Sequence, residues 1–470
     1  MEHECGILSI SSKDILHKNT FIEHLKKLEH RGREAFGIGY ITFRKSYHQN
    51  EVIYNTITID KYPYRVSEYD FAIHKDKNIG NNVIGHVRYS TTKSKKNGGN
   101  IQPLLGNHPI LGNFVLVHNG NIPKGVETIS SQMENKSDTY ILLEFIENCN
   151  EKNYESILLK MLNTIKNVYC ISILDEMGTL YACRDTTGIR PLVIGKSNTG
   201  ICIGSETCCF PKEYKYCREV VNGEVITIKN GEIINSKVSP YKRSFCSFEH
   251  IYFLHTESIV GGIQVKKIRL ILGKILAQKE KKNNQNYNTD AIVVGSPNSG
   301  ITLGQGFANF LQLEYSQLIW KETGCGRSFI LPDQDSRVKL LNKYVHFNRD
   351  KIKNKIIYLL DDSIVRGNTT KNMVMKLREF GAKEVHIRIG SPPIKHPCFF
   401  GIDIPDRQLL VAVGKTNEEI KNSIGCDSLV YLNIEDVHKA VGDNNMCNGC
   451  FTGKYPGQQR TGFPEGSLDW

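Results

Sequence analysis

The sequence predicts a protein of mixed α/β and α+β class with two domains. At 470 residues, the chain is too long for one ordinary hydrophobic core. Its first half is rich in short apolar runs typical of strands, whereas helical and strand patterns alternate beyond about residue 250. The alternation predicts an open, mostly parallel sheet covered by helices, and the strand-rich half predicts a domain of layered sheets and helices.

The elements of the first domain are predicted from local patterns. Apolar runs indicate its strands, and apolar residues at helical spacing indicate its helices. The strands are expected at residues 5–10, 115–118 and 168–174, and the helices near 21–28 and 139–147. This domain is expected to end near residue 235, and residues 237–247 are expected to connect it to the second domain.

The second domain is expected over residues 250–440. A helix is predicted near 269–278, a strand at 291–294 and another helix after Gly300. The stretch 279–289 is polar and rich in Asn and Lys, so we expect a surface loop there.

One segment of the second domain is the most informative in the chain. Five apolar residues, 356–360, predict a buried parallel strand, and Asp361 and Asp362 follow at its carboxyl end, where open α/β sheets bind ligands. Gly367 and two threonines come before a helical pattern, 371–380, so their N–H groups lie at a helix N-terminus, which suits a phosphate. Two acids beside a phosphate site predict a phosphorylated sugar as ligand. The alternative is a surface turn after a core strand.

Composition limits the partners and the compartment. The formal net charge of +11 favours anionic ligands. Nucleic acid is not expected, because no run of Lys and Arg interleaved with aromatics is present. No secretory signal or apolar run of membrane-span length is visible, so a cytoplasmic protein is expected; an organelle such as a plastid stays open, although no transit peptide is visible. In such a compartment the 14 cysteines are not expected to form a disulfide framework.

Two sets of motifs resemble known families. The strand, acid pair and loop described above resemble the phosphoribosyl-pyrophosphate (PRPP) motif of phosphoribosyltransferases. The first domain resembles the class II glutamine amidotransferases, which are N-terminal-nucleophile hydrolases of αββα architecture. The motifs behind this second resemblance are Cys5-Gly6, His30-Arg31-Gly32, Gly85-His86-Val87-Arg88-Tyr89, His118-Asn119-Gly120-Asn121, Ser137-Asp138, Arg184-Asp185, Gly188-Ile189-Arg190-Pro191-Leu192 and Ser205-Glu206-Thr207.

The amidotransferase resemblance implies a propeptide. Residues 1–4 would be removed, so that Cys5 becomes the first residue of a glutaminase domain spanning 5–235. The free α-amine of Cys5 would then serve as the general base, because its pKa is lower than that of a lysine.

The same resemblance implies the residues that act on glutamine. The Asn119 amide and the Gly120 N–H would form the oxyanion hole for attack by Cys5. Arg88 would bind the substrate α-carboxylate and Asp138 its α-ammonium group, with Arg31 as a further glutamine-binding residue. Taken alone, Asn119-Gly120 is typical of a hairpin turn, and Arg88 and Asp138 are typical of surface charges, so these roles depend on the joint pattern.

The phosphoribosyltransferase resemblance implies an open parallel α/β domain and a PRPP site in it. Asp361 and Asp362 would contact the ribose hydroxyls and, together with Ser299, Mg²⁺. Departures from the family pattern at Asn298, 321–324 and Tyr344 predict weaker binding on the pyrophosphate side. The other residues implied to bind PRPP are Ser363, Arg366, Gly367, Asn368, Thr369, Thr370 and, in a loop that would close over the substrate, Arg327.

The C-terminal tail, residues 441–470, contains one C-x-x-C pair, Cys447 and Cys450. A structural zinc site would need a second such pair, and a redox pair would need the strand–helix setting of thioredoxin. The tail instead resembles that of iron–sulfur glutamine PRPP amidotransferases. This implies that Cys246, Cys398, Cys447 and Cys450 hold a [4Fe–4S] cluster.

Nearly the whole chain thus resembles the propeptide-bearing, iron–sulfur subtype of the glutamine PRPP amidotransferase family. The resemblance implies that ammonia from glutamine is transferred to C1 of PRPP in the first step of purine synthesis. It also implies purine nucleotides as feedback inhibitors and a homo-oligomer, either dimer or tetramer. Two alternatives stay open: a glutamine-dependent sugar-phosphate aminotransferase, and a PRPP-binding regulator with impaired transferase activity.

Overall fold

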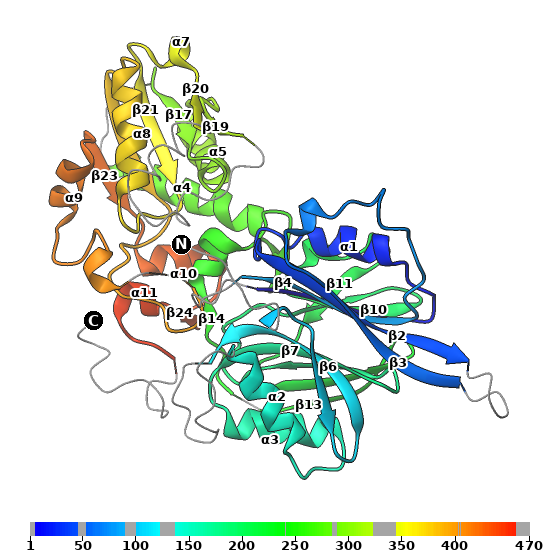
Figure 1. The fold of residues 1–470 in the computed structure, drawn as a ribbon. Helices are drawn as coiled ribbons and strands as arrows, with labels where there is room; N and C mark the ends of the chain where they lie inside the picture. Colours follow the sequence, from blue (N-terminus) through cyan, green and yellow to red (C-terminus); the bar gives the residue numbers. More distant parts are fainter. Residues whose placement is uncertain are drawn as a thin grey trace.

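The computed structural model describes residues 5–45, 53–89, 100–122, 137–239, 241–283, 289–322, 345–402, 404 and 406–456. Figure 1 shows two lobes, with the first half of the chain in one and most of the second half in the other. Residues 434–452, near the red end of the colour scale, return to lie between the lobes. None of the helices in these residues is both long and apolar enough to cross a membrane.

The first lobe contains two antiparallel sheets. The seven-stranded sheet has the order β11-β9-β10-β1-β4-β2-β3, and the six-stranded sheet has the order β13-β12-β8-β7-β6-β5. Their strands are β1 (Gly6–Ser12), β2 (Ala35–Lys45), β3 (Ile53–Tyr62), β4 (Asn82–Arg88), β5 (Leu104–His108), β6 (Gly112–Asn121), β7 (Val168–Asp175), β8 (Leu180–Arg184), β9 (Val193–Lys196), β10 (Gly200–Gly204), β11 (Lys215–Glu219), β12 (Glu224–Lys229) and β13 (Glu232–Val238).

Three helices cover the outer faces of these sheets. Helix α1 (Lys18–Lys26) packs on the seven-stranded sheet. Helices α2 (Thr139–Glu147) and α3 (Tyr154–Thr164) pack on the six-stranded sheet. The two sheets share a third core between them, so the layers run helix, sheet, sheet, helix, as Figure 1 also shows. The predicted αββα architecture is confirmed.

Strand β7 shows how the sequence produces these layers. All its residues are buried, because both faces of the sheet are covered. Tyr169, Ile171 and Ile173 face the helices, whereas Cys170 and Leu174 face the other sheet. This alternation is the period of two of a strand.

The second lobe is built on a parallel sheet in the order β18-β17-β21-β22-β23. Helices α4, α5 and α10 cover one face, and α8 and α9 cover the other. The predicted open parallel α/β domain is therefore confirmed. Its elements are α4 (Val265–Asn283), β17 (Ile292–Gly295), α5 (Gly300–Leu311), β18 (Glu314–Tyr315), β21 (Ile356–Asp361), α8 (Asn368–Glu379), β22 (Glu384–Ile389), α9 (Asn417–Ile424), β23 (Ser428–Tyr431) and α10 (Ile434–Val441).

The prediction of a surface loop from residue 279 is wrong for its first part, because α4 continues to Asn283. The reason is Glu280, which is buried rather than exposed. Its carboxylate accepts hydrogen bonds from Arg388 at 2.7 Å and from Tyr358 at 2.9 Å. These two partners on the sheet hold the last turns of the helix in place.

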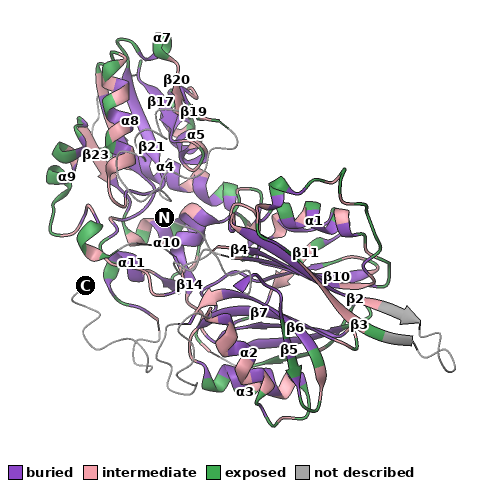
Figure 2. Cartoon of the chain, viewed as in Figure 1, coloured by how far each residue is buried: buried purple, intermediate pink, exposed green. Residues whose placement is uncertain are grey.

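Short elements join the lobes. Strand β14 (Phe245–Cys246) follows the first lobe and pairs in parallel with β24 (Met446–Cys447) of the tail. Figure 2 shows that β14 and most of α11 are buried where the lobes meet, and that α10 is partly buried there. The remaining elements are α11 (Gly449–Thr452), the hairpin of β15 (Ile259–Val260) and β16 (Ile263–Gln264), the pair β19 (Ile319–Lys321) and β20 (Val345–Phe347), α7 (Arg349–Ile352), a π-helical turn (Glu249–Phe253) and 3₁₀ turns at Val66–Glu68, Thr207–Cys209 and Arg407–Leu409.

Candidate active sites

The first site surrounds Cys5, which lies directly before β1. Its sulfur is 3.6 Å from the carbonyl oxygen of Tyr89. Burial and, to a smaller extent, the carboxylate of Asp138 raise the pKa of the thiol, and Arg88 lowers it, so that the pKa is about 12. The thiol is therefore protonated in this arrangement and needs a base to become a nucleophile. These electrostatic effects also show that Arg88 and Asp138, predicted from separate motifs, lie near the sulfur.

Different elements bring these residues together. Arg88 ends β4, which pairs with β1 so that Val87 lies opposite Gly6. Asp138 precedes α2, and its carboxylate accepts a hydrogen bond from the N–H of Ile122 at 3.0 Å, just beyond the end of β6. The bond attaches the start of α2 to the strand that carries the predicted oxyanion residues.

The predicted oxyanion residues lie in β6. The Asn119 side chain is buried, and its amide nitrogen has no hydrogen-bond partner among the described residues. A buried donor without a partner is costly unless a ligand satisfies it, and an oxyanion would do so. At Gly120 a side chain is excluded, because a Cβ would lie 2.2 Å from the carbonyl oxygen of Val168.

Arg31 is fully buried and contacts the backbone of Cys5. Its Nε donates to the Cys5 carbonyl oxygen at 3.2 Å. Its Nη1 donates to Glu206 at 2.7 Å and its Nη2 to Glu249 at 2.8 Å. The guanidinium therefore holds the backbone of Cys5, and its contact with glutamine stays a prediction.

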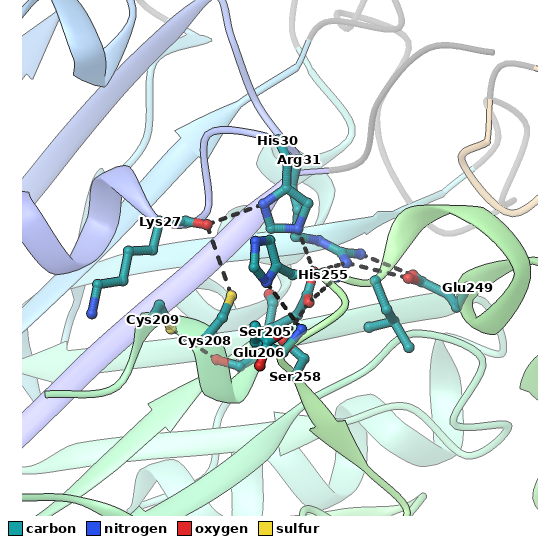
Figure 3. A network of polar contacts seen from close by, with 12 residues as sticks. Lys27, His30, Arg31, Ser205, Glu206, Cys208, Cys209, Glu249, His255 and Ser258 are labelled. Atoms are coloured by element: carbon teal, nitrogen blue, oxygen red, sulfur yellow. Dashed lines mark hydrogen bonds and ion pairs between the residues drawn. The ribbon is translucent and has the colours of Figure 1, made fainter. Parts of the chain in front are cut away.

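Glu206 and Glu249 bind Arg31, and the sequence patterns assigned no role to either acid. Glu206 also accepts hydrogen bonds from His30, the N–H of His255 and the hydroxyl of Ser258. It thereby joins the first lobe to the segment that begins the second (Figure 3). In the sequence, the one sign that Glu249 is buried is its position within an apolar run. Glu206 is visible there only as part of the motif Ser205-Glu206-Thr207.

The second site lies at the carboxyl end of β21. Asp361 and Asp362 are both buried there. Asp361 accepts a hydrogen bond from the N–H of Asp362 at 3.0 Å, and the Ser299 hydroxyl lies 3.5 Å from its carboxylate. Burial raises the pKa of Asp361, and the neighbouring charge of Asp362 raises it further. Two adjacent carboxylates in this position favour a cation or a set of hydroxyl donors.

A loop and helix follow the acid pair, as predicted. Gly367 has a φ of 80°, a left-handed conformation that favours glycine. The helix begins at Asn368 and not at Lys371, because Gly367 completes the turn directly before it. Asn368, Thr369 and Thr370 therefore lie in the first turn, where N–H groups have no partner within the helix. Arg366 is half-buried in the loop, and the Ser363 hydroxyl donates to Asp362.

Several predicted residues lie outside the described part of the chain. These are residues 1–4, residues 323 and 324 of the departure at 321–324, Arg327, Tyr344 and residues 457–470 of the tail. Asn298 is described, and the peptide bond between Pro297 and Asn298 is cis.

The four cysteines of the predicted cluster lie near one another. Cys246 is opposite Cys447 in the parallel pair of β14 and β24. Burial raises the pKa of the Cys450 thiol, and its neighbours Cys398 and Cys447 raise it further. Burial likewise raises the pKa of Cys246, as do Cys447 and Cys398. Within the described residues, no three His, Cys, Asp or Glu side chains are arranged to hold a metal ion.

The cysteine region touches the first site. The side-chain amide of Asn121, at the end of β6, donates to the carbonyl oxygen of Phe399 at 2.9 Å. Arg190 donates to the carbonyl oxygen of Phe400 and is 3.4 Å from Glu249. The segment after Cys398 thus packs against the strand that carries Asn119.

Comparison with known proteins agrees with this geometry. Residues 86–212 match the family model of a glutamine amidotransferase domain. The chain is 34% identical to the amidophosphoribosyltransferase of Bacillus subtilis, over 97% of this chain and 94% of that protein. It is 36% identical to that of Pyrococcus horikoshii, over 97% of both. The chain belongs to the amidophosphoribosyltransferase family.

The solved structures extend this family assignment to the fold. A B. subtilis glutamine PRPP amidotransferase, complexed with ADP and GMP, is 33% identical with a TM-score of 0.80, and the match covers 96% of this chain and 97% of that one. A structure described as the allosteric regulatory enzyme of purine biosynthesis is 32% identical with the same TM-score, over 96% of both chains. The predicted resemblance to the amidophosphoribosyltransferase family is confirmed.

Proposed function

We propose that this chain is a glutamine-dependent amidophosphoribosyltransferase of purine synthesis that acts in the cytoplasm. It hydrolyses glutamine at Cys5 and transfers the ammonia to C1 of PRPP, giving 5-phosphoribosylamine, pyrophosphate and glutamate. The observation that supports this best is the presence of two half-sites in one chain. One has Arg88 and Asp138 near the Cys5 thiol and an unpartnered Asn119 amide in β6, and the other places Asp361 and Asp362 before a helix N-terminus.

The glutaminase step begins with a proton transfer. Burial raises the pKa of Cys5 to about 12, so a base must remove its proton. Once residues 1–4 are removed, the α-amine of Cys5 is that base. The thiolate attacks the glutamine amide carbon, and the Asn119 amide and the Gly120 N–H bind the resulting oxyanion. The proton then leaves with ammonia, and water releases glutamate from the thioester.

Substrate binding at this site depends on two opposite charges. Arg88 binds the α-carboxylate of glutamine, for which a bidentate guanidinium is suited. Asp138 binds the α-ammonium group. Arg31 acts through the Cys5 carbonyl, which it holds at 3.2 Å.

At the PRPP site, residues 363–370 bind the 5-phosphate through N–H groups and hydroxyls at the start of α8. Asp361 and Asp362 bind the ribose hydroxyls. The oxygens of these acids and of Ser299 suit Mg²⁺, a hard cation that would balance the buried negative charge and the pyrophosphate. Arg327 belongs to the loop proposed to close over PRPP.

The four cysteines suit a [4Fe–4S] cluster, which takes four thiolates. Each ligand of such a cluster binds a different iron, so the thiolates lie further apart than the ligands of one ion. Cys246, Cys398, Cys447 and Cys450 come from the connection, a loop of the second lobe and the tail. The cluster would therefore join these three segments, and its role would be structural.

Regulation and assembly follow the family pattern in this proposal. The B. subtilis structure was obtained with ADP and GMP. We infer purine nucleotides as feedback inhibitors and a dimeric or tetrameric homo-oligomer.

One assay separates the candidate functions. Glutamate and pyrophosphate are measured together after glutamine and PRPP are added, and the expected result is equal amounts of both. A sugar-phosphate aminotransferase would release glutamate without pyrophosphate. A regulator without transferase activity would not release glutamate and pyrophosphate in equal amounts.

Mass spectrometry of the active protein should show a chain that begins at Cys5. Activity from a chain that retains Met1 would contradict the role of the α-amine.

A further inference from the structure

A closed ring of hydrogen bonds lies buried beneath the Cys5 site. The N–H of His118 donates to the Gln102 side-chain oxygen at 2.6 Å. The Gln102 side-chain nitrogen donates to the Thr139 hydroxyl oxygen at 3.0 Å. The Thr139 hydroxyl oxygen in turn lies 3.2 Å from His118 Nδ1. All three residues are at most 5% exposed, so water does not compete for these bonds.

A fourth residue attaches another strand to this ring. His86 is fully buried in β4, and its Nε2 lies 3.1 Å from the carbonyl oxygen of His118. Because a carbonyl only accepts, Nε2 carries the proton and donates it. Burial lowers the pKa of His86 to about 3 and also lowers that of His118, so both rings are neutral.

Three of the four network members lie within two positions of a residue of the glutamine site in the sequence. His118 directly precedes Asn119 in β6, and Thr139 directly follows Asp138. His86 lies in the same strand as Arg88. The network therefore joins the three separate elements that supply the oxyanion donor, the ammonium acceptor and the carboxylate binder.

We propose that His86, Gln102, His118 and Thr139 are positioning residues that set the spacing between Asn119, Asp138 and Arg88. The proposal rests on the proposed function. Glutamine presents an amide, an ammonium group and a carboxylate at distances fixed by its covalent structure. A displacement of about 1 Å in one contact can lower the rate about 10²-fold, so three contacts on three elements need a rigid link between them.

The first test is Thr139→Val, which keeps the shape of the side chain but removes the hydroxyl that closes the ring. We expect kcat/KM for glutamine to fall about tenfold or more, with KM raised through Asp138 and kcat lowered through Asn119. Synthesis with added ammonia, measured on the same preparation, reports on the folded transferase site. The ratio of glutamine-dependent to ammonia-dependent activity is therefore the quantity that should fall.

Two variants serve as controls. Thr139→Ser keeps the hydroxyl and should restore most of the ratio. Thr227→Val removes a buried threonine hydroxyl of the same lobe, which donates to Glu155 at 2.7 Å in a different part of the fold. Its ratio should equal that of the wild type, which separates positioning from a general loss of stability.

Gln102→Met is the second variant, because it removes both polar atoms of the ring at similar side-chain length. If Thr139→Val does not fold, Gln102→Met should show the same fall in the ratio. A wild-type ratio in whichever of these two variants folds would overturn the proposed network. Failure of the wild type itself to convert glutamine and PRPP would instead overturn the proposed function.

Discussion

The two half-sites of this protein are stabilised in different ways. Around Cys5, the supporting charges are paired with opposite charges, as Arg31 is with Glu206 and Glu249, and the neutral ring of Gln102, His118 and Thr139 is closed by hydrogen bonds. At the end of β21, two buried carboxylates adjoin each other, and their mutual repulsion raises the pKa of Asp361 beyond the effect of burial. The first site is therefore assembled before its ligand arrives, whereas the second stores unfavourable charge that a ligand or cation must balance.

The largest effect is expected from Cys5→Ala. This change removes the nucleophile, so glutamine-dependent synthesis should fall at least about 10³-fold. Synthesis from added ammonia at high pH should persist, since free ammonia reaches C1 of PRPP without the first site. Both rates are measured as pyrophosphate release.

Cys217→Ala is the matched control for this experiment, because Cys217 is exposed. It should keep both activities. If folded Cys5→Ala protein is equally inactive with ammonia and with glutamine, the two half-sites are not separable and the comparison fails.

The next effect concerns the acid pair. Replacing both Asp361 and Asp362 with Asn should lower the rate about 10²-fold or more with either nitrogen source, because the ribose contacts serve both reactions. Unlike Thr139→Val, this change should raise the melting temperature, by a few degrees in the absence of PRPP and Mg²⁺.

The expected rise in melting temperature follows from the raised pKa of Asp361. The folded state binds a proton more tightly than the unfolded state, so the wild type should become less stable as pH rises above the ordinary Asp pKa of about 4. The Asn variant should lack this part of the pH dependence. Asp14→Asn, at an exposed position, is the control; a lower melting temperature for the double variant would contradict the idea of stored charge.

The four cysteines of the predicted cluster lie in segments that contact both lobes, so variants at these positions test a part of the molecule shared by the two half-sites. Cys447→Ser should remove the visible absorption of an iron–sulfur cluster and lower the melting temperature, since ligation free energy is also folding free energy. Cys398→Ser should do the same. Cys426→Ser alters a buried cysteine outside the set and should keep its iron; normal iron content in either of the first two variants would remove that residue from the ligand set.

The smallest effect is expected at the pyrophosphate side of the second site. Asn298→Asp, combined with Tyr344→Lys, should lower the KM for PRPP a few-fold. The two changes restore the charged side chains that the family pattern has at these positions. The KM for glutamine is the internal control and should not change. A raised KM for PRPP would show that the departures are adapted to this chain.

Contiguous segments were predicted well from the sequence. The order of strand, acid pair, glycine turn and helix over residues 356–380 is set by neighbours in the chain, so local patterns suffice to predict it. The same holds for β7, where an apolar run predicts the strand that the structure shows. The roles of Cys5, Asn119 and Asp138 came from motifs, and the structure places the Asp138 carboxylate near the Cys5 thiol.

Tertiary structure alone decided the contacts between distant residues. Arg31 meets Glu249 across 218 positions of sequence, and Glu280 meets Arg388 across 108. A polar Lys- and Asn-rich stretch predicts a loop, yet Glu280 is buried because its partner on β22 compensates its charge. Gln102 gave no sequence signal for the same reason. The local sequence pattern shows the period of apolar residues and thus predicts helices and strands. The partner of a buried polar group is determined only when the sheets and helices pack together.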